Sequence, residues 1–448
     1  MLSLFGHRDY RHLFAAQMSA LFGTGLTTVA LGLLAYHLAG ARAGAVLGTA
    51  LTIKMLAYVI VAPIAGAFAD RVPRRLMMVS LDLSRALVVL ALPFVDQAWQ
   101  IYILIVVLQS ASAAFTPTFQ AVLPDILPDE RDYTRALSAS QLASTMESLL
   151  SPMLAAILLS LISFHWLFTG TAIGFLASAS LVVTTRLPDA TRNTRRGIWD
   201  RTMAGIHIFA ATPRLRGVMG LNLAVAAAGS VVMVNTVNVV RDTLAGTQAD
   251  VAVLLAANGF GTMIVALGIP RALDRIPARP IMLTGAAILA TGLAGALAIS
   301  PSGADAGLWP AVLVIWAAIG VGTGLVLTPT GNVLRRSSQP ADRPAIFAAQ
   351  FSLSHLCWLL TYPIAGWVAT TAGFTTTWAA LAALTVAGIA IAIRCWPRHD
   401  PQILDHTHTA DSVDPAHLHD AQPVDAHHYR HAHAFVIDDT HRHWPSTA

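Results

Sequence analysis

The sequence is short of charge, lysine, glutamate and cysteine, and these shortages exclude several classes of protein. Charged residues make up 12% of the 448 positions and apolar residues 55%, whereas an average soluble domain is about 25% charged. Such a chain cannot cover its folded surface with polar groups, so we expect it to lie in a lipid bilayer. Its two cysteines, Cys357 and Cys395, lie in or at the end of apolar segments and do not define a disulfide framework.

Sequence motifs for catalysis are also missing. The chain has no glycine-rich phosphate-binding loop, no nucleophile elbow and no zincin motif, so we expect neither an enzyme nor a bound cofactor. The first apolar run is too long for a signal peptide and lacks a small-x-small cleavage site. We therefore predict that this run is an uncleaved first helix.

Apolar runs long enough to span a bilayer, about 20 residues each, make up most of the chain. The last block, from Pro344 to Ile393, carries no charge and is too long for a single span. It contains Gly373 after a pair of threonines, which marks a turn, so we divide it there. Twelve helices are then predicted, near residues 13–38, 45–69, 76–95, 100–122, 138–163, 166–185, 217–240, 251–270, 280–299, 308–330, 346–369 and 375–394.

The positions of the arginines predict the orientation of these helices, because basic residues favour cytoplasmic loops. With the N-terminus in the cytoplasm, only Arg42 and Arg241 fall on the outer side. Both termini are then cytoplasmic, in a multi-pass protein of the cytoplasmic (inner) membrane. The basic connector at 189–215 is explained by topology and anionic lipid, which we favour over nucleic-acid binding.

Two short strings recur in the second half of the chain. Asp70-Arg71 and its basic turn are echoed by Asp274-Arg275-Ile276-Pro277-Ala278-Arg279, and Phe115-Thr116-Pro117-Thr118 is echoed by Leu327-Thr328-Pro329-Thr330. Both copies are displaced by nearly the same distance, which indicates a chain built from two similar halves.

The first of these strings also carries a family resemblance. Gly66-x-x-x-Asp70-Arg71-x-Pro73-Arg74-Arg75 resembles the loop 2–3 signature of the major facilitator superfamily, and Pro117-x-x-x-Ala121-x-Leu123-Pro124-Asp125 resembles its drug and siderophore exporter branch. The resemblance implies an all-α membrane fold of two pseudo-symmetric six-helix bundles that rock about a central cavity. The implied units are 1–188, a connector at 189–215, 216–396 and a tail at 397–448.

In that family the loop signature has a gating role. The resemblance carries this role to Gly66, Asp70, Arg71, Arg74 and Arg75, and the weaker second copy carries it to Asp274 and Arg275. The alternative is a loop that only fixes the topology. That alternative explains the arginines but neither Gly66 nor Asp70.

Four charged residues fall inside predicted helices, where each costs about 2.5–3.5 kcal/mol at the helix centre. Asp82 and Arg85 are three residues apart and can neutralise each other, so we expect a structural or gating pair. Lys54 is the only lysine and Glu147 is one of two glutamates, and both lie mid-span. We predict that at least one takes part in transport. A plain ion pair between them is the alternative.

Two residues of the eleventh predicted helix, His355 and Cys357, lie near the position equivalent to Glu147. Imidazole, thiolate and carboxylate at mid-membrane would suit a divalent metal, and a histidine can also carry a proton. The alternative is a histidine that is simply hydrogen-bonded and a cysteine that simply packs.

The tail differs in composition from the rest of the chain. Residues 397–448 hold 11 of the 17 histidines and have no membrane-length run, so we expect disorder. Residues two apart in an extended chain lie about 7 Å from each other on the same side, so each His-x-His pair can close on one metal ion. A purification tag and a merely solvated tail are the alternatives. The predicted metal ligands are His406, His408, His417, His419, His427, His428, His431, His433, His441 and His443.

A histidine-rich tail on an exporter-like body resembles the nickel-resistance exporters of the same superfamily. We therefore predict a monomeric proton antiporter that exports nickel, with cobalt or zinc as alternatives, and whose tail collects the metal. A drug or siderophore exporter of the same fold is the first rival. A membrane-anchored protein that stores or senses metal is the second.

Overall fold

The computed structural model describes most of the chain. The described ranges are 5–68, 73–127, 157–185, 198–273, 275–300, 305–339, 343–400, 403–409, 422–425 and 428–437, together with single positions between 129 and 155 and with 441 and 444. Nearly all described residues before the tail are helical, which confirms an all-α membrane fold. Nine segments of the described part are long and apolar enough to cross a membrane. Two of these, Arg8–Val61 and Ala349–Cys395, each contain two helices.

The first half contains α1 (Arg8–Ala39), α2 (Ala43–Phe68), α3 (Arg74–Ala91), α4 (Ala98–Ile126) and α6 (His165–Thr184). Short 3₁₀ turns at Gly40–Arg42 and Leu92–Phe94 follow α1 and α3. The predicted fifth helix is described only at single positions up to 155 and then from 157, and most of these are helical. Each described helix coincides with a predicted apolar run to within a few residues.

The second half begins with α8 (Pro213–Ser230), which continues through the π-helix η4 (Val231–Asn235), α9 (Thr236–Asn238) and the π-helix η5 (Val239–Thr243). It goes on with α10 (Gln248–Leu273), α11 (Ala278–Ile299) and α12 (Trp309–Arg336). The chain then forms α13 (Arg343–Pro363), the π-helix η8 (Ile364–Val368) and α14 (Ala369–Cys395). Inside α14, Gly373 has φ 80° and ψ 171°, a backbone conformation open mainly to glycine. This break confirms the predicted division of the last apolar block.

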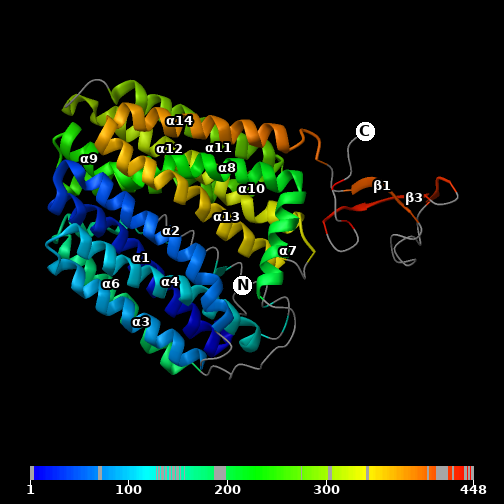
Figure 1. Ribbon diagram of the computed structural model, residues 1–448, viewed down its shortest axis with the longest axis horizontal. Helices are drawn as coiled ribbons and strands as arrows, with labels where there is room; N and C mark the ends of the chain where they lie inside the picture. Colours follow the sequence, from blue (N-terminus) through cyan, green and yellow to red (C-terminus); the bar gives the residue numbers. More distant parts are fainter. Residues whose placement is uncertain are drawn as a thin grey trace.

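The two halves repeat one packing pattern. In the first half α1 packs on α6, α2 on α4, and α3 on both α4 and α6; in the second half the matching pairs are α8 with α14, α10 with α12, and α11 with both α12 and α14. Figure 1 shows the two sets of helices as adjacent bundles, with α2 and α13 lying between them. The repeat predicted from the sequence is therefore a repeat of structure.

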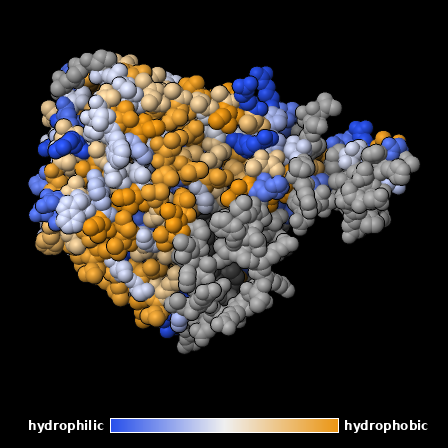
Figure 2. Space-filling view, in the orientation of Figure 1, coloured by the Kyte–Doolittle hydropathy of each residue, from blue (hydrophilic) through white to orange (hydrophobic). Residues whose placement is uncertain are grey.

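Glycines let several helices approach closely. A Cβ added to Gly220 would lie 2.4 Å from the carbonyl oxygen of Gly388, and one added to Gly320 would lie 1.9 Å from that of Asn258. Small residues at such crossings are how membrane helices bring their backbones into contact. Apolar side chains cover the visible face between two more hydrophilic ends (Figure 2), as a lipid-facing surface requires. Large apolar side chains such as Leu87 are exposed as well, in this case by 72%.

We call the two ends of the bundles the tail end and the far end. At the tail end Arg75 donates to the Thr185 carbonyl at 2.7 Å, and Arg279 donates to the Trp396 carbonyl at 3.0 Å. The far end holds the turn at Gly40–Arg42 and the end of η5. The connector contains a helix that the sequence did not predict, α7 (Ile198–Ala211), which packs against α8, α13 and α2. Its Phe209 is buried.

The tail was predicted to be disordered, and for its described residues that prediction is wrong. Three strands form one antiparallel sheet in the order β1-β3-β2, with β1 at Ile403–Thr409, β2 at Gln422–Pro423 and β3 at His428–Ala434. The physical reason is that the tail does not rely on its own apolar content. Phe435 and Ile437 are 3% and 1% exposed and belong to the same apolar core as the second-half helices.

Candidate functional site at the interface of the two halves

Polar contacts close the two halves against each other at the far end. The Tyr36 hydroxyl of α1 donates to Asp242 Oδ1 of η5 at 2.6 Å, and Asn238 Nδ2 donates to the Ala41 carbonyl at 3.2 Å. The guanidinium of Arg241 lies over the Tyr36 ring at 5.4 Å. These contacts join the end of the first helix to the end of the seventh, so this end of the interface is shut.

The closure continues inward along α2. A Cβ added to Gly48 would lie 2.9 Å from the Cα of Gly366 in η8, so the two backbones touch. Beside them Trp367 Nε1 donates to Thr49 Oγ1 at 2.9 Å. No side chain larger than hydrogen fits between α2 and η8 at this level, which makes this crossing a narrow seal.

Deeper in the interface, a ring stack joins α2 to α13. Tyr58 lies parallel to His355 with ring centroids 5.1 Å apart and planes 17° apart, and it also contacts Phe351 at 5.6 Å. His355 Nδ1 lies 2.6 Å from the Phe351 carbonyl oxygen. Since a carbonyl only accepts, Nδ1 carries the hydrogen and Nε2 is left as the basic nitrogen. The stack therefore presents a hydrogen-bond acceptor of the second half beside a phenol of the first.

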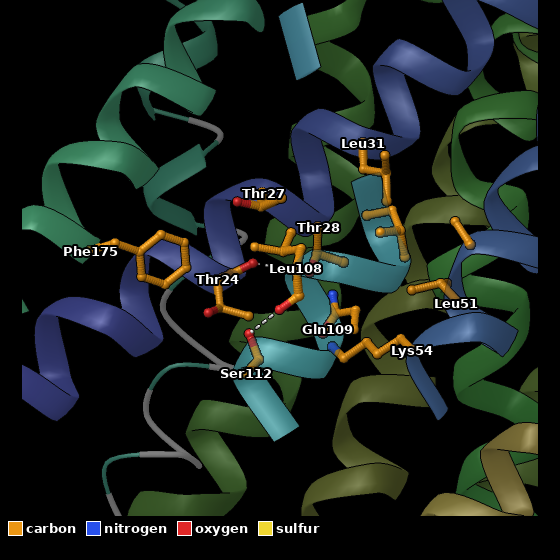
Figure 3. Close-up of a pocket in the computed structure, with 12 residues that line it drawn as sticks. Thr24, Thr27, Thr28, Leu31, Leu51, Lys54, Leu108, Gln109, Ser112 and Phe175 are labelled. Carbon is orange, nitrogen blue, oxygen red and sulfur yellow. Dashed lines mark hydrogen bonds between the residues drawn. The ribbon is translucent and has the colours of Figure 1, made fainter. Parts of the chain in front are cut away.

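Lys54 lies one turn along α2 from Tyr58 and lines a small pocket among α1, α2, α4 and α6. Its amine extends toward Gln109 of α4 (Figure 3), whose buried Oε1 accepts no hydrogen bond from the residues that the structure describes. The cavity volume is about 10 Å³, room for about one water molecule. Thr24, Thr28 and Ser112 each donate to a carbonyl of their own helix, so their oxygens remain free to accept a bond from water or ammonium.

Glu147 of the fifth helix lies against α1 at Gly25. A Cβ added to Gly25 would lie 2.7 Å from Glu147 Oε1 and 2.0 Å from Ser151 Oγ, so glycine makes room for both side chains. Lys54 and Glu147 form no ion pair within 4.0 Å, although both are described. Their charges are nevertheless close enough to act on each other, and Lys54 acts in the same way on His355. The plain ion pair is therefore not the observed arrangement.

We call Lys54, Tyr58, Glu147 and His355 the interface group. The structure thus brings together three of the four residues predicted for transport. The fourth, Cys357, follows His355 by two residues, about 200° around the helix, and is 5% exposed. The described part of the chain contains no group of three or more His, Cys, Asp or Glu that could hold a metal ion.

Asp82 and Arg85 pair directly, as their spacing predicted. Asp82 also accepts a bond from Ser178 Oγ at 2.7 Å, and the Arg85 guanidinium lies between the rings of Phe115 and Phe175 at 4.3 and 4.5 Å. All of these partners belong to the first half. The arrangement ties α3 to α4 and α6.

The loop signature is only partly visible. Asp70, Arg71 and Asp274 lie outside the described residues, and Gly66 lies near the end of α2. Arg74 is 8% exposed, and Arg75 bonds Thr185 within its own half. Arg275 is exposed. A gating role for these residues stays a prediction.

Two members of the site were not predicted from the sequence, Tyr58 and Gln109. Neither carries a charge, and each lies in an apolar run where a tyrosine or glutamine is unremarkable. For Tyr58 the available signal was its spacing, since it follows Lys54 by four residues and so shares the same helix face.

Comparison with known proteins agrees with the fold. The sequence model described as Major Facilitator Superfamily matches residues 13–217 and 218–434. An uncharacterized MFS-type transporter of Bacillus subtilis (strain 168), YfiS, is 28% identical over 127 residues, which span 28% of this chain and 30% of that protein.

Solved structures of similar shape include a bacterial homologue of the human lysosomal transporter Spinster in an inward-facing, unoccupied conformation. It has a TM-score of 0.64 and 14% identity, with 87% of this chain and 97% of that chain covered. A D-xylose-proton symporter has a TM-score of 0.63 and 15% identity over the same shares of the two chains. At these low sequence identities, the structural similarity shows a shared fold and no more.

Proposed function

This chain belongs to the major facilitator superfamily, whose sequence model matches both of its halves, and we propose that it is a proton-driven exporter of divalent transition metal ions. The chain is a multi-pass membrane transporter. The finer proposal places it in the cytoplasmic (inner) membrane with both termini, and so the tail end, in the cytoplasm. Nickel is the proposed cargo, with cobalt and zinc as alternatives, and the tail collects it.

The gathering of the interface group supports proton coupling. Lys54 and Glu147 come from the first half and His355 from the second, and Tyr58 of the first half stacks on His355. A dication approaching this group is attracted when Glu147 is ionised and Lys54 is neutral, and it needs the bare Nε2 of His355 as a ligand. Protons bound to these groups weaken metal binding, so binding of the metal ion releases protons and binding of protons releases the metal ion. That exclusion is the condition for antiport.

The shut far end supports an inward-open resting state. With the contacts of Tyr36, Asn238 and Trp367 in place, cargo would reach the interface group from the tail end only. Alternating access would then break these contacts and close the tail end. The metal would leave toward the far side as protons return to Glu147 and His355.

A drug or siderophore exporter is the second candidate, because one observation favours it. The Lys54 amine lines a pocket together with threonine, serine and glutamine. When protonated, this amine suits an anionic or hydroxyl-rich organic cargo better than a bare cation. A metal storage protein with an inert membrane anchor has less support, because both halves match the transporter family.

The test is counterflow in inverted proteoliposomes with an imposed pH gradient. Nickel, cobalt, zinc and an anionic siderophore are compared as cargo for the wild type, Glu147→Gln and His355→Ala. We expect metal uptake that needs the gradient and that falls about tenfold or more in both variants. Asp96→Asn, an exposed carboxylate of the far end, is the matched control and should transport normally. Siderophore uptake without metal uptake would select the second candidate.

A further inference from the structure

The pocket beside Lys54 contains a buried hydrogen-bond acceptor that lacks a donor. Gln109 of α4 is 7% exposed, and its Oε1 accepts no hydrogen bond from the residues that the structure describes. Buried polar atoms in folded proteins are almost always satisfied, by the protein or by an ordered water molecule. The pocket offers a means for both, because it combines a cavity of about 10 Å³ with the Lys54 amine.

The Lys54 amine can be satisfied within the same pocket. A protonated lysine has three hydrogens to donate and accepts none. Besides Gln109 Oε1, the hydroxyls of Thr24 and Thr28 can accept, because each already donates its own hydrogen to a carbonyl of α1, at 2.9 and 3.1 Å. A water molecule that accepts from Lys54 and donates to Gln109 Oε1 and to one threonine would make three hydrogen bonds, the usual number for a buried water.

We propose that this pocket binds one water molecule and that Gln109, acting through this water, positions the Lys54 amine. Figure 3 shows the amine extending from α2 toward Gln109. The amine is thereby held toward α4 and away from the carboxylate of Glu147. Gln109 is in this sense a positioning residue, since it acts on the interface group through Lys54.

Glu147 is the partner that Lys54 would otherwise take. A Cβ added to Gly25 would lie 2.7 Å from Glu147 Oε1, and the preceding residue, Thr24, lines the pocket. The carboxylate and the pocket therefore lie beside the same turn of α1, and the charges of Lys54 and Glu147 act on each other. Buried charges of opposite sign are costly when they are left unpaired. A specific interaction must therefore hold the amine out of an ion pair with Glu147, and the water and Gln109 supply it.

The position of the amine decides what Glu147 can bind. With Lys54 held in the pocket, the carboxylate is open to a metal ion or a proton. Once released, the Lys54 ammonium would compete with the metal for Glu147 as a cation that belongs to the protein itself. This consequence for transport rests on the proposed function, whereas the position of Lys54 does not.

Cross-linking measures the position of the amine directly, because Lys54 is the only lysine of the chain. A membrane-permeable carbodiimide joins an amine to a carboxylate that it contacts, without a spacer. Mass spectrometry of the full-length protein in micelles then quantifies the Lys54–Glu147 product. We expect little product in the wild type and about fivefold more in Gln109→Leu, the population change that accompanies loss of one hydrogen bond. Gln109→Glu keeps an acceptor, so the cross-link should form instead with the carboxylate that this substitution introduces.

Two further variants separate the water and the packing. Thr28→Val removes one hydroxyl while keeping the shape of the side chain, and it should raise the Lys54–Glu147 product about twofold by weakening the water. The matched control is Gln17→Leu, which removes another buried glutamine of the first half. Gln17 exchanges hydrogen bonds with Ser140, at 2.8 Å in one direction, and it does not line the pocket. This control should leave the product at the wild-type level, and size-exclusion chromatography checks that each variant remains folded.

Transport by the same variants tests the consequence for cargo. Gln109→Leu should raise KM for nickel about fivefold with a smaller change in kcat, because Lys54 then competes for Glu147. Equal cross-linking in Gln109→Leu and the wild type, or an equal rise in Gln17→Leu, would refute positioning by Gln109. An unchanged product in Thr28→Val would refute the water. The expected cross-linking pattern in a protein that transports no metal would refute the proposed function and leave the position of Lys54 established.

Discussion

Replacing Asp82 with alanine should strongly destabilise the first half, because it leaves a buried cation without its partner. Asp82 is 0% exposed and Arg85 is 3% exposed. The rings of Phe115 and Phe175 already contact the guanidinium in the wild type, so they offer no new compensation. Removing one partner of a buried ion pair costs about 3–5 kcal/mol, which changes the unfolding equilibrium constant by about a hundredfold or more.

The measurement is reversible unfolding of the purified protein in mixed detergent micelles. The matched control is the double variant Asp82→Ala with Arg85→Leu, which removes both charges and should recover most of the lost stability. A loss below about 1 kcal/mol in the single variant, the size of an ordinary exposed pair, would refute the reasoning. Transport by the double variant separates two roles: a structural pair predicts normal transport, and a gating pair predicts a folded but inactive protein.

Two further predictions concern the helix contacts. Gly25→Ala should destabilise the protein by about 1–3 kcal/mol and reduce transport, because the new Cβ would lie 2.0 Å from Ser151 Oγ. The control is Gly331→Ala, whose Cβ meets nothing within 4 Å and which should be tolerated. Equal thermal stability of the two variants would contradict the packing of α1 on the fifth helix. Asp242→Ala removes the acceptor of Tyr36 and Asn238 and should open the far end, with the open population rising about fivefold for a loss of about 1 kcal/mol at this exposed site. The measurement is the distance between spin labels at Arg42→Cys and Ala372→Cys, in a variant lacking Cys357 and Cys395. Opening of the far end would increase the population with the longer distance. An unchanged distance distribution would show that the contact does not hold the halves together.

Much of the membrane part could be predicted because its signals are local. Apolar length defined the helices, and a single glycine after two threonines placed the break now seen at Gly373. Lys54, Glu147 and His355 stood out because ionisable groups within a bilayer are costly. Tyr58 and Gln109 were missed because their role depends on neighbours from other helices. Cys357 was predicted as a ligand from the chemistry of its thiol alone. Its position on a different face of the helix separates it from His355.

The tail shows a different limit. Composition describes what a segment can bury by itself, and residues 397–448 cannot bury enough apolar surface to fold alone. The structure instead packs Phe435 and Ile437 into the core of the second half. The opposition of His406 and His431 depends on strand register. Register between separated segments is set by tertiary contacts and is not readable from either segment by itself.

The anchoring of the tail also has a consequence for movement. Asp400, Trp396 and Trp444 bind residues of the second bundle, namely Arg214, Arg279 and Arg336. If the bundles swing as rigid bodies, the tail sheet travels with one of them and sweeps past the other in every cycle. The distance between the tail sheet and α3 would then change once in every transport cycle.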